Sequence, residues 1–149
     1  MIVRTLTALT PEALADLQAL MACLSERFIF SPDTFQRVVS DPHTHLIVAE
    51  HEGHIVGCAT LCEFSTLMGR RASVEDVIVL PHRRGCGIGR MLMEHVIHLA
   101  QQQAPITLQL TSRPHRQAAR HLYRQMGFTL KETGFFQLKM ENGKLKMES

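Results

Sequence analysis

A glycine- and arginine-rich segment near the middle of the chain has the chemistry of an anion-binding turn. It reads Arg84, Gly85, Cys86, Gly87, Ile88 and Gly89, followed by Arg90. Glycines let backbone N–H groups approach phosphate oxygens, and a helix that begins here would add unsatisfied donors and the positive end of its dipole. The alternative is a glycine-rich strand-to-helix turn without a ligand. The residue types favour a phosphate-binding site.

Two common phosphate-binding motifs do not fit this turn. No Gly-Lys-Ser or Gly-Lys-Thr follows the glycines, as a P-loop requires. Arg90 stands where the last glycine of a dinucleotide-binding G-x-G-x-x-G would fall when counted from Gly85. Both nucleotide-binding interpretations are therefore disfavoured.

The turn does match the Arg/Gln-x-x-Gly-x-Gly/Ala motif of the GNAT acetyltransferase superfamily. A second segment resembles the signature of the next helix in that superfamily, and it reads Ala119-x-x-Leu122-Tyr123-x-x-x-Gly127-Phe128. The two motifs occur in the expected order and spacing, and the resemblance covers nearly the whole chain. It implies an N-acetyltransferase that uses acetyl-CoA as cosubstrate.

The resemblance also implies which residues contact the cofactor. In this superfamily the sheet is splayed between its fourth and fifth strands, and the pantetheine arm enters that gap. Val77, Ile78 and Val79 resemble the residues whose backbone pairs with the pantetheine, and residues 84–90 resemble those around the pyrophosphate. Arg116 stands where an asparagine often contacts the cofactor, so this position departs from the family pattern. Arg113 or Arg116 could instead bind a phosphate or an acidic substrate, or be ordinary surface arginines.

Tyr123 is the only tyrosine in the chain, and it occupies the motif position that donates a proton to the CoA sulfur in many relatives. A phenol is protonated at neutral pH and lies at the end of a rigid ring, which suits this role. The alternative is a helix residue that merely covers the edge of the core. The resemblance favours Tyr123 as the catalytic acid.

Glu75 is the candidate for the residue that deprotonates or binds the amine. Strand alternation predicts that Ser73, Glu75, Val77 and Val79 share one face, which places Glu75 near the predicted thioester. Val74-Glu75-Asp76-Val77 also resembles the same strand in glucosamine-phosphate acetyltransferases. The glutamate of the histone-type branch would align with Ser73, which cannot act as a base. An ordinary solvated or salt-bridged strand glutamate is the alternative.

Other reactive side chains do not suggest a site. Direct acetyl transfer needs no covalent intermediate, so Cys86 is not interpreted as a nucleophile. His95 with His98 and His43 with His45 have metal-ligand spacing but no evident third ligand, so no metal is expected. The four cysteines form no C-x-x-C pair and are expected to be reduced and mostly buried.

Length and composition predict one ordinary domain over residues 1–149, with 141–149 as a tail that frays. The formal net charge of +2 is too small for a dedicated nucleic-acid or membrane-surface protein. Without a long apolar run or a signal-like N-terminus, a cytoplasmic protein is expected. A homodimer is plausible from family habit alone.

Strand and helix patterns alternate along the chain. Thr10-Pro11 and Ser31-Pro32 predict helix starts, and a hairpin is expected over 51–54. The remaining elements are strands over 2–8, 46–49, 55–61, 72–80, 106–111, 128–131 and 135–140, a helix from Gly87 or Gly89, and a helix from Pro114 to Gly127. The predicted class is α/β (an α+β sandwich), with a mixed, mostly antiparallel sheet of six to seven strands flanked by about four helices.

The acceptor is the least constrained part of the prediction. The leading hypothesis is transfer to a primary amine of a small molecule or peptide. A protein N-terminal or lysine acetyltransferase is the nearest alternative, and a non-catalytic CoA-binding sensory module is a different class. The first two helices and the loop around 65–69 would border the acceptor, and they match no specificity motif.

Overall fold

The computed structural model describes residues 1–146, which form two compact units, one over residues 1–111 and one that begins at Ser112. Each unit has its own local structure. The prediction of a single domain over 1–149 stays a prediction.

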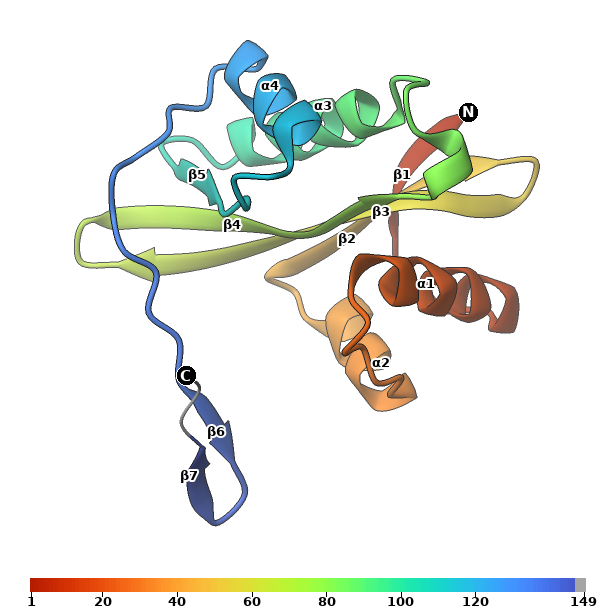
Figure 1. The fold of residues 1–149 in the computed structure, drawn as a ribbon, viewed down its shortest axis with the longest axis horizontal. Helices are drawn as coiled ribbons and strands as arrows, with labels where there is room; N and C mark the ends of the chain where they lie inside the picture. Colours follow the sequence, from red (N-terminus) through yellow and green to blue (C-terminus); the bar gives the residue numbers. More distant parts are fainter. Residues whose placement is uncertain (147–149) are drawn as a thin grey trace. The chain divides into compact units, whose positions relative to one another are not determined.

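The first unit is built on one five-stranded sheet in the order β1-β2-β3-β4-β5 (Figure 1). β1, β2, β3 and β4 are antiparallel neighbours, whereas β5 runs parallel to β4. The strands span Ile2–Leu6, Thr44–His51, His54–Thr66, Gly69–Val79 and Thr107–Leu110. The predicted mixed, mostly antiparallel α/β architecture is confirmed, although this sheet has five strands rather than six or seven.

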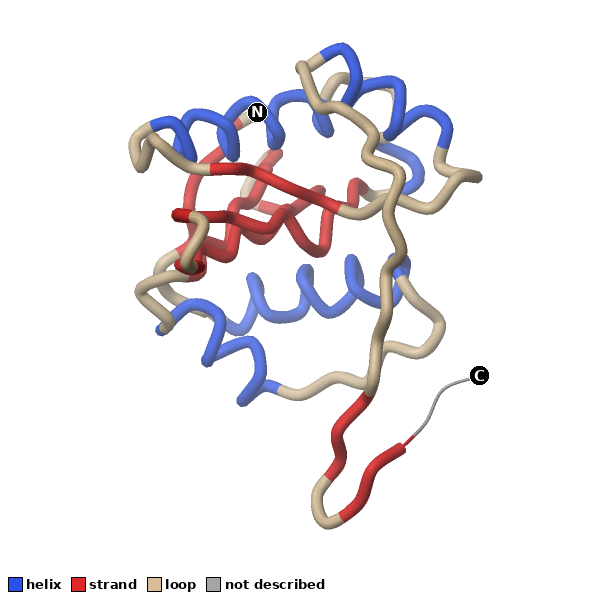
Figure 2. The backbone as a smooth tube through the Cα atoms, turned by 90° about the vertical axis from the view of Figure 1, so that its left-hand side faces the viewer, coloured by secondary structure: helices blue, strands red, loops and turns tan. Residues whose placement is uncertain are grey.

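Helices cover both faces of this sheet. α1 (Pro11–Leu24) and α2 (Pro32–Ser40) lie on one face, and α3 (Ile88–Gln101) lies on the other (Figures 1 and 2). The predicted caps are present, because Thr10 Oγ1 accepts from the Ala13 N–H at 3.1 Å and Ser31 Oγ accepts from the Thr34 N–H at 3.4 Å. A short 3₁₀ turn, Pro81–Arg83, connects β4 to the segment before α3.

Apolar side chains fill the space between the sheet and each helix layer. Beneath α1 and α2 the buried cluster consists of Leu6, Leu17, Leu20, Leu46, Val48, Ile55, Cys58 and Ile78. On the α3 face, Gly57 permits close packing, because a Cβ there would lie 3.2 Å from Leu92 Cδ1 and 3.3 Å from Ile88 Cγ2. The beginning of α3 is thereby held against β3.

Both hairpins of the sheet are tight. Glu52 and Gly53 have φ values of 51° and 81° and reverse the chain between β2 and β3, as predicted. The predicted loop around 65–69 is wrong, because β3 continues to Thr66 and β4 begins at Gly69. The Thr66 hydroxyl donates to the Gly69 carbonyl at 3.0 Å and accepts from the Met68 N–H at 3.2 Å, which closes a much shorter turn.

The second unit contains α4 (Gln117–Gln125), β6 (Lys139–Glu141) and β7 (Lys144–Lys146). α4 begins later than the predicted Pro114, since residues 113–116 form a turn in which the Arg116 N–H donates to the Arg113 carbonyl. The predicted strands over 128–131 and 135–140 are largely wrong. A strand needs a neighbouring strand, and within this unit only β6 and β7 pair with each other.

The predicted fraying tail overlaps this hairpin. Glu141 and residues 144–146 belong to its two strands, and the expectation that the tail frays stays a prediction. Residues 147–149 lie outside the described residues.

Candidate functional site

One edge of β4 is open near its C-terminal end. β5 pairs with β4 only from Arg71↔Thr107 to Val74↔Leu110, whereas β4 continues to Val79. Within the unit Met1–Thr111, residues 75–79 therefore have no strand on their β5 side. Unpaired strand N–H and C=O groups can bind an extended chain as an added strand would. The three predicted pantetheine-binding residues lie in this open part of β4.

A β-bulge interrupts β4 at the beginning of the open edge. The register changes from Thr60↔Glu75 to Cys58↔Ile78, so β4 holds one residue more than β3 between these pairs. Asp76, inside this interval, has a left-handed backbone with φ of 54°. Bulges commonly redirect side chains and end regular pairing beside functional sites.

The bulge changes the face on which Glu75 lies. Paired residues point to the same face, and Thr60 and Cys58 are two residues apart, so Glu75 and Ile78 share one face. Val77 therefore lies on the opposite face. The prediction that Glu75 shares a face with Val77 is wrong, because simple alternation does not hold across a bulge.

Glu75 lies on the sheet face that α1 and α2 partly cover. Its side chain is exposed, and its Oε1 accepts a hydrogen bond from the Ser73 hydroxyl at 2.9 Å. It is also the first β4 residue beyond the pairing with β5, which ends at Val74. A carboxylate is thus present at the point where the sheet opens.

Further carboxylates surround Cys62 on the same face. Burial raises the pKa of the Cys62 thiol, and the negative charges of Glu75, Asp76 and Asp41 raise it further. A hydrogen bond with the Thr44 side chain acts in the opposite direction. Three carboxylates thus lie near Cys62 on this face, which is called the acidic face below.

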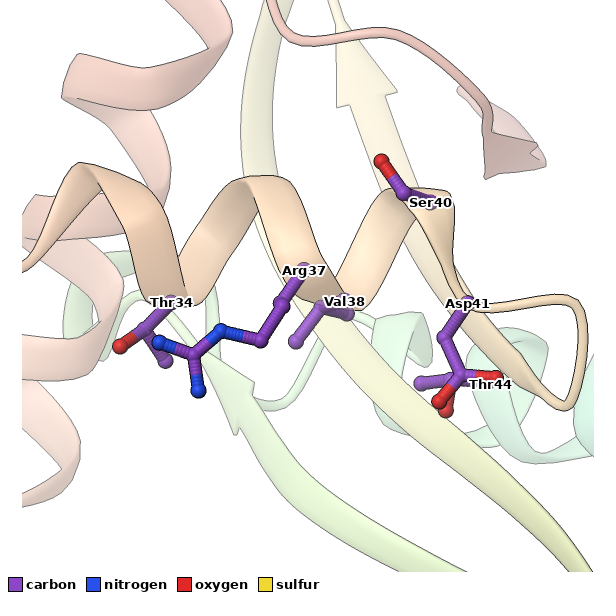
Figure 3. A pocket seen from close by; sticks show the side chains of 6 residues that line it. All are labelled: Thr34, Arg37, Val38, Ser40, Asp41 and Thr44. Atoms are coloured by element: carbon purple, nitrogen blue, oxygen red, sulfur yellow. The ribbon is translucent and has the colours of Figure 1, made fainter.

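An open pocket of about 460 Å³ lies where α2 meets β2 (Figure 3). In the close view, Arg37 extends from α2 beside Thr34, whereas Asp41 and Thr44 lie together at the other end. The pocket is lined by Thr34, Arg37, Val38, Ser40, Asp41 and Thr44. Since Asp41 and Thr44 also contribute to the surroundings of Cys62, the pocket adjoins the acidic face.

The glycine-rich turn leads from β4 into α3. Gly85 and Gly87 both have φ of 80°, a conformation that residues with a Cβ rarely adopt, and Gly87 caps α3 without a side-chain bond. Ile88 anchors the helix because it is only 2% exposed. Residues 84–87, which precede the helix, are exposed, and Arg84 Nε donates to the Val79 carbonyl at 3.3 Å.

Other residues of the predicted pyrophosphate site also lie at this turn. Cys86 is an exposed free thiol, and Gly89 lies in the first turn of α3. The distance between Arg90 Nη1 and Glu94 Oε1 is 3.9 Å. The structure brings residues 84–90 together with the open edge of β4, because the two segments are separated only by the short 3₁₀ turn.

In the second unit, the predicted helix signature forms a Schellman C-cap. The Phe128 N–H donates to the Tyr123 carbonyl at 3.0 Å, and the Gly127 N–H donates to the Arg124 carbonyl at 3.1 Å. Gly127 has φ of 99°, which explains the glycine. The rings of Tyr123 and Phe128 meet edge to face with centroids 5.9 Å apart. The spacing of the motif therefore fixes where the tyrosine ring lies.

The phenol of Tyr123 is kept in its protonated form. The residue is 9% exposed, and burial raises the pKa of the phenol, while the positive charge of Arg116 acts in the opposite direction. Arg116 is the N-cap residue of α4 and makes no side-chain capping bond. Arg113 is exposed. Tyr123 and Arg116 are thus electrically coupled within the second unit.

The remaining candidates do not form sites among residues 1–146. No group of three metal-ligating side chains occurs there, and His45 is instead paired with Glu63 at 2.8 Å. Cys23, Cys58, Cys62 and Cys86 are all free, but the expectation that they are mostly buried is wrong, because Cys23 and Cys86 are exposed and only Cys58 is fully buried. The part of the chain that the structure describes contains no helix both long and apolar enough to cross a bilayer.

Sequence reasoning missed the residues around the bulge, namely Cys58, Thr60 and Asp76. One available signal was the acidic pair Glu75-Asp76 within an apolar strand, because aspartate is uncommon in strand interiors. The contribution of Arg37 and Asp41 to a pocket had no recognisable signal.

The sequence of this chain is similar to those of curated acetyltransferases. The chain is 34% identical over 89 residues to a streptothricin acetyltransferase from Streptomyces lavendulae, covering 60% of this chain and 46% of that protein. It is 31% identical over 97 residues to the N-alpha-acetyltransferase RimI of Mycobacterium tuberculosis, covering 65% of this chain and 60% of that protein. The chain thus spans about half to three fifths of these curated relatives.

The fold also matches solved structures. One is AAC(6')-Iy in complex with the bisubstrate analogue CoA-S-monomethyl-acetylneamine, with a TM-score of 0.74, 16% identity, and coverage of 93% of this chain and 97% of that chain. Residues 12–128 match the model of the acetyltransferase (GNAT) family. The open edge of β4, the glycine turn at the start of α3 and these similarities agree, and the chain belongs to the GNAT acetyltransferase family.

Proposed function

We propose that this chain transfers the acetyl group of acetyl-CoA directly to a primary amine of a small molecule or peptide. The observation that carries the proposal is the continuity of the open edge of β4 with the glycine turn at the start of α3. An extended arm that ends in a pyrophosphate fits these two neighbouring features. Free strand groups suit the amides of pantetheine, and the helix N-terminus suits the phosphates.

The cofactor-binding residues follow from this fit. Val77, Ile78 and Val79 offer backbone groups to the pantetheine arm. The backbone of residues 85–89, with Arg84 and Arg90, surrounds the pyrophosphate, and the family resemblance adds Arg116 as a cofactor-binding residue. The family match over residues 12–128 and the CoA-derived ligand of AAC(6')-Iy support this assignment.

The chemistry needs a base and an acid. The acceptor ammonium group loses a proton to Glu75, directly or through water, and the neutral amine attacks the thioester carbonyl carbon. The nitrogen of the tetrahedral intermediate loses its second proton to solvent, and the intermediate expels the CoA thiolate, which takes a proton from Tyr123. Glu75 then releases its proton to solvent and Tyr123 regains one, so that the net reaction releases one proton. An amide bond forms as the thioester bond breaks. No step needs a protein nucleophile, in keeping with the position of Cys86 in the turn.

The charges on the acceptor side support a cationic amine. Glu75, Asp76 and Asp41 all act on the Cys62 thiol, so their negative charges are concentrated on one face of the sheet. An ammonium group is attracted to such a face before it is deprotonated. One curated relative is named as a streptothricin acetyltransferase and another as an N-alpha-acetyltransferase, so their names point to different acceptors and the acceptor is settled by experiment.

The proposal is tested by incubating the full chain with isotopically labelled acetyl-CoA and three acceptor panels. The panels are small-molecule amines, peptides with free N-termini, and lysine-containing peptides with blocked N-termini. We expect label in one panel, detected by mass spectrometry with matching thiol release. Label confined to lysine side chains would favour the lysine acetyltransferase alternative. Tight acetyl-CoA binding without label in any panel would contradict the proposal and favour a sensory module.

Gly87→Val is expected to raise the KM for acetyl-CoA about tenfold with little change in kcat, because a β-branched residue disfavours the positive φ and moves the N–H groups of the turn. The measurement is steady-state kinetics with varied acetyl-CoA.

Gly53→Val is the matched control. Gly53 has nearly the same φ, 81° against 80°, and in both glycines a Cβ would meet no atom within 4 Å. It lies in the β2–β3 turn, far along the chain from the cofactor segment. Equal increases in KM for the two variants would show that strain, and not the phosphate site, causes the effect.

A further inference from the structure

We propose that Thr60, with Cys58 beside it, is a positioning residue that holds the β4 bulge in the shape needed for acetyl transfer. The inference rests on the proposed function, because it concerns the backbone that receives the thioester arm. It assigns a role to buried β3 side chains that are not expected to touch either substrate.

Two bonds from β3 converge on the bulge residue. The Thr60 hydroxyl donates to Asp76 Oδ2 at 3.2 Å, and the Cys58 thiol donates to the Asp76 carbonyl at 3.4 Å. Both donors are buried, with Thr60 4% and Cys58 1% exposed. Apart from Cys58 and Tyr123, Thr60 is the only residue with a polar side-chain group that is buried as a whole among the described residues. Thr60 thus binds the side chain of Asp76, and Cys58 binds its backbone.

The residue so held has an unfavourable backbone. Two non-glycine residues of the described chain have positive φ, and Glu52 is in a hairpin turn, so Asp76 is the one inside a strand. Aspartate tolerates this region better than most residues but still prefers negative φ. The bonds from Thr60 and Cys58 therefore oppose a tendency of Asp76 to return to regular strand geometry.

A return of Asp76 to regular strand geometry would disturb the open edge of β4. The bulge supplies the extra residue that brings Ile78 opposite Cys58. Without it, the register of residues 77–79 would slip by one, and a slip by one residue reverses which face each side chain points to. The N–H and C=O groups along the open edge would be redirected as well.

The Cys58 thiol can serve as a lasting donor. Burial raises its pKa far above the ordinary value, and the charge of Asp76 raises it further. It therefore keeps its proton, and it cannot compete with the acceptor amine as a thiolate.

The test is a double-mutant comparison in the full chain. Thr60→Val removes the hydroxyl at nearly constant shape, Thr60→Ser keeps it, and Asp76→Gly lets residue 76 adopt positive φ without support. With the acceptor identified, we expect Thr60→Val to lower kcat about tenfold and to leave the KM for acetyl-CoA within about twofold, because a small misplacement of reacting groups mainly affects the chemical step. Thr60→Ser should restore most of kcat.

The decisive comparison is the effect of Thr60→Val on kcat in the otherwise unchanged chain and in a chain that carries Asp76→Gly. In a chain that already carries Asp76→Gly, Thr60→Val should change kcat by less than about twofold, because glycine needs no hydroxyl to hold its φ. An equal loss in both backgrounds, or no loss in either, would overturn the proposal. A general packing role of Thr60 would give the equal loss.

A second readout separates this inference from the proposed function. Amide hydrogen exchange at residues 76–79, measured without any cofactor, should be faster in Thr60→Val, and this acceleration should disappear in the Asp76→Gly background. Unchanged exchange would overturn the role of Thr60 even in an active enzyme. Faster exchange in a protein that acetylates nothing would support the bulge contact and refute the proposed function.

Discussion

Tyr123→Phe is expected to lower kcat about a hundredfold while the KM for acetyl-CoA stays within about twofold, because general acid catalysis is worth this order of magnitude. The substitution removes only the hydroxyl and leaves the ring that meets Phe128. Steady-state kinetics with saturating acceptor measures both constants. Equal turnover in the variant would show that Tyr123 is not the acid.

The pH dependence gives an independent check on Tyr123. Burial raises the pKa of its phenol, so the protonated, donating form persists to a higher pH than for an exposed tyrosine, whose pKa is about 10. Activity should therefore show no loss attributable to Tyr123 up to about pH 10. A descending limb between neutral pH and pH 10 that vanishes in Tyr123→Phe would contradict a raised pKa.

Phe128→Leu is the control for ring packing. It removes the aromatic contact with Tyr123 while keeping the phenol and the backbone bond from residue 128 to the Tyr123 carbonyl. A loss in kcat much smaller than that of Tyr123→Phe would assign the effect to the hydroxyl. A loss as large would assign it to the position of the ring.

Glu75→Gln is expected to lower kcat/KM for the acceptor about a hundredfold, since it removes the carboxylate but keeps the shape and the hydrogen bond with Ser73. If Glu75 acts as the base, the loss lies in kcat. If it binds the ammonium group, the loss lies in the KM for the acceptor. The measurement is kinetics at varied acceptor and saturating acetyl-CoA.

Glu52→Gln is the matched control, because it makes the same change at an exposed glutamate in the β2–β3 turn. Its constants should match those of the unchanged chain within about twofold. If Glu75→Gln also leaves kcat and the KM for the acceptor unchanged, the carboxylate of Glu75 has no part in the reaction.

The parts of the site that were predictable are those with a local cause. Gly87 is needed where φ is positive at the start of α3, and Gly127 where α4 ends in a Schellman motif. Thr10 and Ser31 cap the first two helices for the same kind of local reason. Each of these features depends on a few neighbouring residues, so a single sequence reveals it.

The parts that were not predictable depend on distant partners. The bulge residue Asp76 is bonded to Cys58 and Thr60, which are 18 and 16 residues away. Strand alternation therefore misplaced Glu75 relative to Val77. The strands predicted over 128–131 and 135–140 failed for a related reason, since an alternating pattern does not specify a neighbouring strand.

The central claim is that acetyl-CoA lies along the open edge of β4 with its pyrophosphate at the glycine turn. Its most direct test is amide hydrogen exchange of the full chain with and without saturating acetyl-CoA. We expect slower exchange at Val77, Val79 and residues 85–89, because the ligand binds these N–H groups whereas the Ile78 N–H faces β3, and no change in the turn over 51–54. Binding of acetyl-CoA that leaves Val77, Val79 and residues 85–89 unprotected would contradict the claim.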